Sequence, residues 1–228
     1  MNRRTTCTRT RIRRGGMPAV LAATGALLLG ACGGDGGGSS DEIKGADKGG
    51  ESPSASASAS KGEATDDGIK RPVIKLGKGA ENVFEKADTG DPVKDGVLAD
   101  AQRGINASDQ VITRHKGVKT LEFYSKKGAL LDANNYVKGW VEDGRSWVGK
   151  VRYYDWAVEL QGEHKATVKY CIDQSGGQTK LLKSGKLLPN NGGKKNFGYA
   201  TSQMERNKEG VWQEVSGDTE PEAERCMK

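Results

Sequence analysis

The residues best placed to do acid–base chemistry lie in the stretch 146–160, whose aromatic and β-branched side chains predict a long strand. Side chains alternate between the two faces of a strand, so Tyr153 and Asp155 are predicted to share a face. A carboxylate turned into an apolar cavity has a raised pKa and can act as a base beside a phenol. Tyr153 and Asp155 are therefore the candidate catalytic residues, and an outward-facing, solvated Asp155 is the alternative.

Other residues that could do chemistry have simpler explanations. His164 lies in the polar segment QGEHK, where a solvated ring is expected. His115 falls at the end of a predicted helix, where a protonated ring suits the helix dipole. Tyr154 and Asp173 are further candidates. The sequence holds no serine–histidine–acid order, metal-ligand cluster or phosphate loop, so no cofactor or metal is predicted.

Two groups of side chains could bind a partner. Five lysines in the acid-free stretch 174–204 could contact an anionic envelope polymer or lipid headgroups, with a solvated loop as the alternative. They are Lys180, Lys183, Lys186, Lys194 and Lys195. The four tryptophans either pack in the core or line a binding pocket. They are Trp140, Trp147, Trp156 and Trp212.

The first 32 residues indicate where the protein acts. Six arginines, with no lysine or acid, precede an apolar run at 17–29 that is too short to span a bilayer as a helix. This arrangement is typical of an export signal. The segment ends in LGAC, which resembles the site where a bacterial lipoprotein leader is cut and the following cysteine, here Cys32, receives a lipid. An ordinary signal peptide is the alternative.

The basic charge of the whole chain belongs to this leader. The chain has 36 lysines and arginines against 30 acids, and six of the basic residues precede Cys32. The mature chain is therefore formally neutral, which removes the usual argument for a nucleic-acid partner. We expect a protein on the outer face of the cell membrane, held there by the lipid on Cys32.

Two cysteines remain for the mature domain, because Cys7 is in the leader and Cys32 is predicted to carry the lipid. Cys171 and Cys226 are an even pair in an exported protein, where disulfides persist. This favours a bridge between them. Two free thiols or a metal site are the alternatives, and isolated cysteines without nearby histidines are poor zinc ligands.

Composition divides the chain into a signal peptide (1–31), a disordered tether rich in Gly, Ser and Ala (32–78), and one domain (79–228). Within the tether, RPVIKLG (71–77) either docks on the domain or ends the linker. Hydrophobic periodicity predicts helices at 91–115 (with a break near Gly104), 121–126 and 129–143, followed by strands at 146–160, 165–173, 195–207 and 210–218. This order predicts an α+β domain with helices packed on a curved antiparallel sheet.

The order of these elements resembles the nuclear transport factor 2-like (SnoaL-like) domains of exported, lipid-anchored bacterial proteins. The resemblance covers about 91–226 and rests on YCIDQSGG in one strand, EGVWQEV in the last strand pair and a cysteine near the C-terminus. It implies a cone-like fold around an apolar pocket and a bridge between Cys171 and Cys226. Such domains use the pocket for small-molecule catalysis, for ligand binding or for docking to a partner.

These observations favour a membrane-anchored, non-catalytic domain that binds a small apolar ligand or docks on an envelope component. One alternative is a small enzyme of the isomerase, dehydratase or cyclase kind, which a buried carboxylate beside Tyr153 would favour. The other is an envelope module whose lysines contact an anionic polymer.

Overall fold

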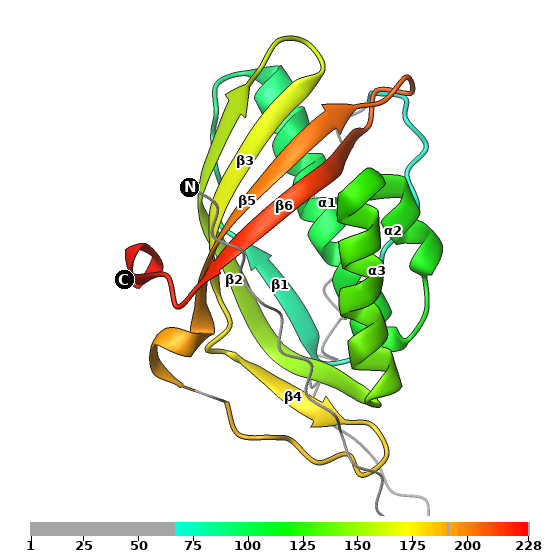
Figure 1. The fold of residues 1–228 in the computed structure, drawn as a ribbon, viewed down its shortest axis with the longest axis vertical. Coiled ribbons are helices and arrows are strands. Elements are labelled where there is room, and N and C mark those ends of the chain that lie inside the picture. The colour runs from blue at the N-terminus through cyan, green and yellow to red at the C-terminus, as the bar shows by residue number, and fades with distance from the viewer. Residues whose placement is uncertain (1–66, 191, 228) are drawn as a thin grey trace, which may run out of the picture. The chain divides into compact units, whose positions relative to one another are not determined.

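The computed structural model describes residues 67–190 and 192–227, so the predicted leader, Cys32 and most of the predicted tether lie outside the described residues. The elements follow the order β1 (Ala80–Phe84), α1 (Pro92–Arg114), α2 (Val118–Tyr124), α3 (Lys127–Glu142), β2 (Arg145–Leu160), β3 (Lys165–Asp173), β4 (Gly177–Leu181), β5 (Phe197–Arg206) and β6 (Trp212–Pro221). The three helices cover one face of a sheet (Figure 1), so the domain is α+β, as predicted.

The sheet is mixed, which corrects the expectation of a purely antiparallel one. Its strand order is β1-β2-β3-β5-β6, with β4 also paired to β2, and β1 runs parallel to β2 while the other pairs are antiparallel. Sequence periodicity missed β1 and β4, because each is only five residues long and carries several polar side chains. β4 lies between the predicted strands 165–173 and 195–207, in a stretch for which the sequence predicted no element.

Helix α1 begins at Asp91, whose carboxylate accepts hydrogen bonds from the backbone N–H groups of Val93 and Lys94. It then continues through Gly104, where a break was predicted. A Cβ atom at Gly104 would lie 3.5 Å from the Cβ of Tyr124, so this glycine lets α2 pack closely against α1. His115 ends the helix in the left-handed conformation.

A bulge in β2 overturns the prediction that Tyr153 and Asp155 share a face. Tyr154 pairs with Cys171 and Ala157 pairs with Lys169, so two residues of β2 oppose one residue of β3. Asp155 sits in the bulge with φ 52° and is exposed. Tyr153 is buried on the helix-facing side of the sheet, where Trp156 also packs.

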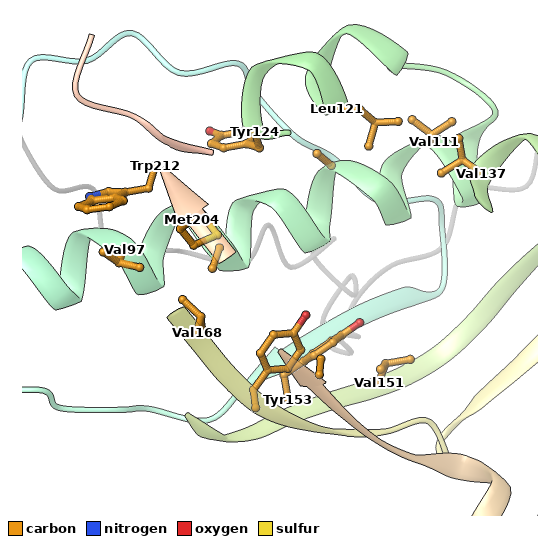
Figure 2. Packing of buried hydrophobic residues seen from close by; sticks show 14 of the residues in the cluster. Val97, Val111, Leu121, Tyr124, Val137, Val151, Tyr153, Val168, Met204 and Trp212 are labelled. Carbon is orange, nitrogen blue, oxygen red and sulfur yellow. The ribbon is translucent and has the colours of Figure 1, made fainter. Parts of the chain in front are cut away.

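The core fills the space between the helices and the sheet. Figure 2 shows side chains of α1, α2 and α3 meeting those of β2, β3, β5 and β6. The labelled members are Val97, Val111, Leu121, Tyr124, Val137, Val151, Tyr153, Val168, Met204 and Trp212. This packing fixes α1 and α3 over the concave face on which the candidate site lies.

The segment 71–77 docks on α1, one of the two outcomes that the sequence left open. The side chain of Arg71 reaches Asp100, and the side chains of Gln110 and Thr113 bind the backbone N–H groups of Lys75 and Gly77 at 2.7 and 2.8 Å. The packed part of the chain therefore begins before residue 79, where the sequence placed the domain boundary.

The opposite face of the sheet carries a disulfide between Cys171 in β3 and Cys226 near the C-terminus, whose Cα atoms are 5.4 Å apart. Tyr154 and Ala223 pack around it, and the Tyr154 hydroxyl donates a hydrogen bond to the backbone oxygen of Cys226. The bridge thus holds the chain end against the sheet.

Candidate functional site

The candidate site is built around a carboxylate that the sequence analysis did not select. Asp109 on α1 accepts a hydrogen bond from Asn82 Nδ2 at 2.7 Å and another from Trp147 Nε1 at 3.2 Å. Tyr153 also lies beside this carboxyl group, and its hydroxyl lowers the pKa of Asp109. Side chains from β1, α1 and β2 therefore converge on one acid between the helices and the sheet.

Enclosure by the protein changes the acidity of this group. Loss of hydration raises the pKa of Asp109 to about 6, and the hydrogen bonds from Asn82, Trp147 and Tyr153 only partly oppose this rise. Burial, reinforced by the charge of Asp109, raises the pKa of the Tyr153 phenol well above its ordinary value. At neutral pH the pair is therefore a carboxylate beside a neutral phenol that can donate a hydrogen bond.

Asp109 and Tyr153 line a cavity of about 160 Å³. Its aromatic walls are Tyr136 and Trp140 from α3 and Trp147 from β2. Polar side chains from the segment after β3 close the other side, and they are Gln178, Thr179, Asn190, Lys195 and Asn196. Of the four tryptophans singled out in the sequence, Trp140 and Trp147 line this cavity. Trp212 packs in the core.

A second cavity of about 360 Å³ adjoins the first, because Tyr136 lines both. It lies between α3 and strands β3, β5 and β6, and its charged lining residues are all acids, namely Asp132, Glu214 and Asp218. Burial raises the pKa of Glu214, and a hydrogen bond with Ser202 partly opposes that rise. The walls therefore mix aromatic rings with carboxylates, whereas the resemblance implied an apolar pocket.

Of the acid–base candidates selected from the sequence, only Tyr153 lies at these cavities. Asp155 is exposed in the bulge, and Tyr154 packs beside the disulfide. Asp173 accepts a hydrogen bond from the Ser175 backbone N–H at 2.8 Å, which is a structural role. His164 is exposed in the turn between β2 and β3.

His115 follows the C-terminal end of α1 and lines neither cavity. Its Nε2 is 3.0 Å from the backbone oxygen of Arg145, which ties the end of the helix to the start of β2. Within the part of the chain that the structure describes, no three His, Cys, Asp or Glu side chains are grouped as metal ligands would be.

A signal for Asp109 was present in the sequence. Val97, Ala101 and Ile105 follow one another at four-residue spacing along the buried stripe of α1, and Asp109 is the next residue in that series. An acid at a core-facing helical position needs partners or a cavity, since an unpaired buried charge is costly.

No protein-family profile matches the chain, and no curated protein sequence matches it. Among solved structures, it is similar to a ketosteroid isomerase-like protein from Erwinia carotovora atroseptica SCRI1043, with 11% identity and a TM-score of 0.41 over 57% of this chain and 95% of the other.

Two further structures are similar at the same level. An NTF-2-like protein of unknown function from Shewanella oneidensis MR-1 has 11% identity and a TM-score of 0.34, over 54% of this chain and 97% of the other. The intermembrane space region of the chloroplast protein ARC6 has 9% identity and a TM-score of 0.40, over 60% of this chain and 99% of the other. Similarity at this level assigns neither family nor activity to the chain.

Proposed function

We propose that the protein is an exported lipoprotein whose domain binds a small molecule in the adjoining cavities between the helices and the sheet. The observation that carries this proposal is the position of the Asp109 carboxylate. Its half-buried carboxylate lies at the wall of an aromatic cavity, where partial loss of hydration disfavours its charge. Asn82 and Trp147 each donate to a different oxygen of the carboxylate, which leaves acceptor positions for a ligand in the cavity.

The lining defines the chemistry of this ligand. Carboxylates prefer hydrogen-bond donors and positive charge, and aromatic rings favour flat apolar bodies and cations. The two cavities together are lined by Asp109, Asp132, Glu214 and Asp218 against the single cation Lys195. The ligand is therefore a small aromatic or cyclic molecule that carries an amine or hydroxyl group.

The anchor is supported by the sequence alone. A basic segment, a short apolar run and LGAC before a Gly- and Ser-rich stretch form the pattern of a lipid-modified cysteine at Cys32. Within residues 67–190 and 192–227, no helix is both long and apolar enough to cross a membrane. Lipid on Cys32 would hold the binding domain at the membrane surface.

Proton transfer is a second candidate function, favoured by the contact between Asp109 and Tyr153. A carboxylate whose pKa is about 6 accepts protons readily near neutral pH, and a neutral phenol can stabilise a developing negative charge. Exchange of the methyl hydrogens of acetophenone in D₂O tests this function. Catalysed exchange by the wild type that is lost in Asp109→Asn would establish it, and equal rates in both proteins would exclude it for this probe.

Binding is tested with three probes that share one ring and differ in the polar group: benzylamine, benzyl alcohol and benzoate. Each is titrated into the ¹⁵N-labelled chain from residue 32 onward, carrying Cys32→Ser, and the tryptophan indole N–H signals are followed. We expect benzylamine and benzyl alcohol to shift the Trp147 signal, with little change at Trp212. The proposal would be contradicted if none of the three probes shifted the Trp147 signal, or if benzoate bound as tightly as benzylamine.

A further inference from the structure

A short hairpin extends from β4 at the end of the sheet where β2 begins (Figure 1). Backbone hydrogen bonds close it, from Leu181 N to Lys186 O at 2.9 Å and from Leu188 N to Thr179 O at 2.8 Å. The hairpin is thus an ordered feature, and it carries three of the five lysines that the sequence analysis singled out.

The surface of this hairpin, residues 179–188, combines apolar and basic side chains. Leu182 and Leu187 expose 45% and 44% of their surface, and Lys183 and Lys186 are exposed at the turn between them. Neither Lys183 nor Lys186 takes part in any ion pair within the described residues. Lys194, by contrast, is paired with Glu224.

Two acids at the end of α3, beside the hairpin, are paired with basic side chains. The hairpin meets the end of α3 through a hydrogen bond from Leu182 N to Gly144 O at 2.9 Å. Just before Gly144, Asp143 pairs with Arg145 at 2.5 Å and Glu142 pairs with Lys138 at 3.6 Å. Both acids at the end of α3 are therefore compensated, which leaves the lysines of the hairpin as the excess charge beside them.

We propose that the hairpin 179–188 is a second membrane contact, which binds anionic phospholipid through Lys183 and Lys186 and buries Leu182 and Leu187 among the headgroups. Lysines near an anionic bilayer each contribute about 1 kcal/mol to binding, and their long stems let the charged ends stay in water. An anionic polymer would satisfy the lysines but would offer nothing to the two leucines. The paired exposure of leucines and lysines therefore favours a bilayer.

The predicted anchor is compatible with this orientation. Arg71 is held to Asp100, towards the opposite end of α1 from His115 and the hairpin. The stretch 33–66 separates Cys32 from the first described residue and could reach at most on the order of 110 Å if fully extended. That length allows the hairpin to reach the bilayer that holds the lipid.

Vesicle binding tests the proposal without the lipid anchor, in the chain from residue 32 onward with Cys32→Ser, whose described fold lies wholly in 67–227. Affinity is measured for vesicles of phosphatidylglycerol and phosphatidylcholine in equal parts and for pure phosphatidylcholine. The test variant is Lys183→Gln/Lys186→Gln. The matched control is Lys165→Gln/Lys208→Gln, which makes the same charge change near the β2–β3 and β5–β6 turns.

We expect binding to the mixed vesicles only, a loss of about 30-fold in the test variant, and little loss in the control, because two lysines account for about 2 kcal/mol. The fluorescence emission of an environment-sensitive dye attached at Leu187→Cys should shift to shorter wavelength on mixed vesicles. The emission of the same dye attached at Glu163→Cys should not shift. Equal losses in the two variants, or no dye shift at position 187, would overturn the proposal. Binding to soluble polyphosphate as tight as to vesicles would assign the lysines to a polymer instead.

Discussion

The Trp147 indole donates a hydrogen bond to the Asp109 carboxylate across 3.2 Å, and this bond joins β2 to α1 at the wall of a cavity. Asp109 is therefore both a structural link and the carboxylate that lines this cavity. These two roles give different signatures, since the first affects stability and the second affects ligand binding.

Ionisation of Asp109 should make the domain less stable as the pH rises. The carboxyl holds its proton up to a pKa of about 6 in the folded state, but only to about 4 when unfolded. The folded state thus binds more protons between pH 4 and 6, so its stability falls with rising pH across that window, by about 2 kcal/mol. The free energy of unfolding of Asp109→Asn should not fall across this window. Urea unfolding of both proteins at pH 4, 5, 6 and 7 measures this difference in pH dependence. Parallel pH profiles for the two proteins would refute it.

The pairing of Arg71 with Asp100 should hold the segment 71–77 on the domain. Asp100 is only 1% exposed, and it accepts hydrogen bonds from Arg71 Nε at 2.9 Å, Arg103 Nη1 at 2.8 Å and the Trp212 backbone N–H at 3.0 Å. Arg71→Ala should lower the free energy of unfolding by about 1–3 kcal/mol, because it removes a hydrogen bond to a buried charge. The exposed neighbour Lys70→Ala is the control, and equal denaturation midpoints for both variants would contradict the role of Arg71.

The bridge between Cys171 and Cys226 should stabilise the domain by closing a long loop. The two residues are 55 apart in sequence, for which the chain-entropy estimate is about 4 kcal/mol. Cys226→Ala should therefore lose much of this stability, and Cys171→Ala/Cys226→Ala should lose no more than either single change. In the Cys32→Ser chain from residue 32, alkylation after unfolding without reductant should find no free thiol, and two labelled thiols would disprove the bridge.

Lipid modification should depend on Cys32 alone. When the full chain is produced in a bacterium that carries out lipoprotein processing, a fatty-acid analogue should label the wild type but not Cys32→Ala. Cys7→Ala is the matched control and should be labelled like the wild type, because Cys7 lies in the predicted leader. Equal labelling of the wild type and Cys32→Ala would remove the anchor at this position.

The elements that sequence patterns predicted well are those with strong local signals. Asp91 and Pro92 mark the start of α1, and the 3.6-residue periodicity carries it to Arg114. The long strand β2 and its partner β3 follow from aromatic and β-branched residues. β1 has no such signal, because its place depends on parallel pairing with a strand more than sixty residues later.

The candidate site was only half predictable, for a local reason and a tertiary one. Tyr153, selected from the sequence, lines a cavity, but Asp155 does not, because the bulge at Asp155 shifts the alternation of β2. No pattern in 153–156 predicts that bulge. Asp109 does continue the buried stripe of α1, although its meaning depends on Asn82 and Trp147, which arrive from separate strands. Only the fold shows that these three side chains meet.

The most direct test of the binding site is the affinity of benzylamine for the wild type and for Asp109→Asn, followed at the Trp147 indole signal at pH 7.5 and pH 5. If the ammonium group of benzylamine binds the Asp109 carboxylate, Asp109→Asn should bind it about tenfold more weakly or worse at pH 7.5. The reason is that a charged hydrogen bond contributes about 1.5–3 kcal/mol. This contact also predicts that the wild type weakens at pH 5, where Asp109 takes up a proton. Unchanged affinity in Asp109→Asn at pH 7.5, or no shift at Trp147 in either protein, would contradict the binding site described here.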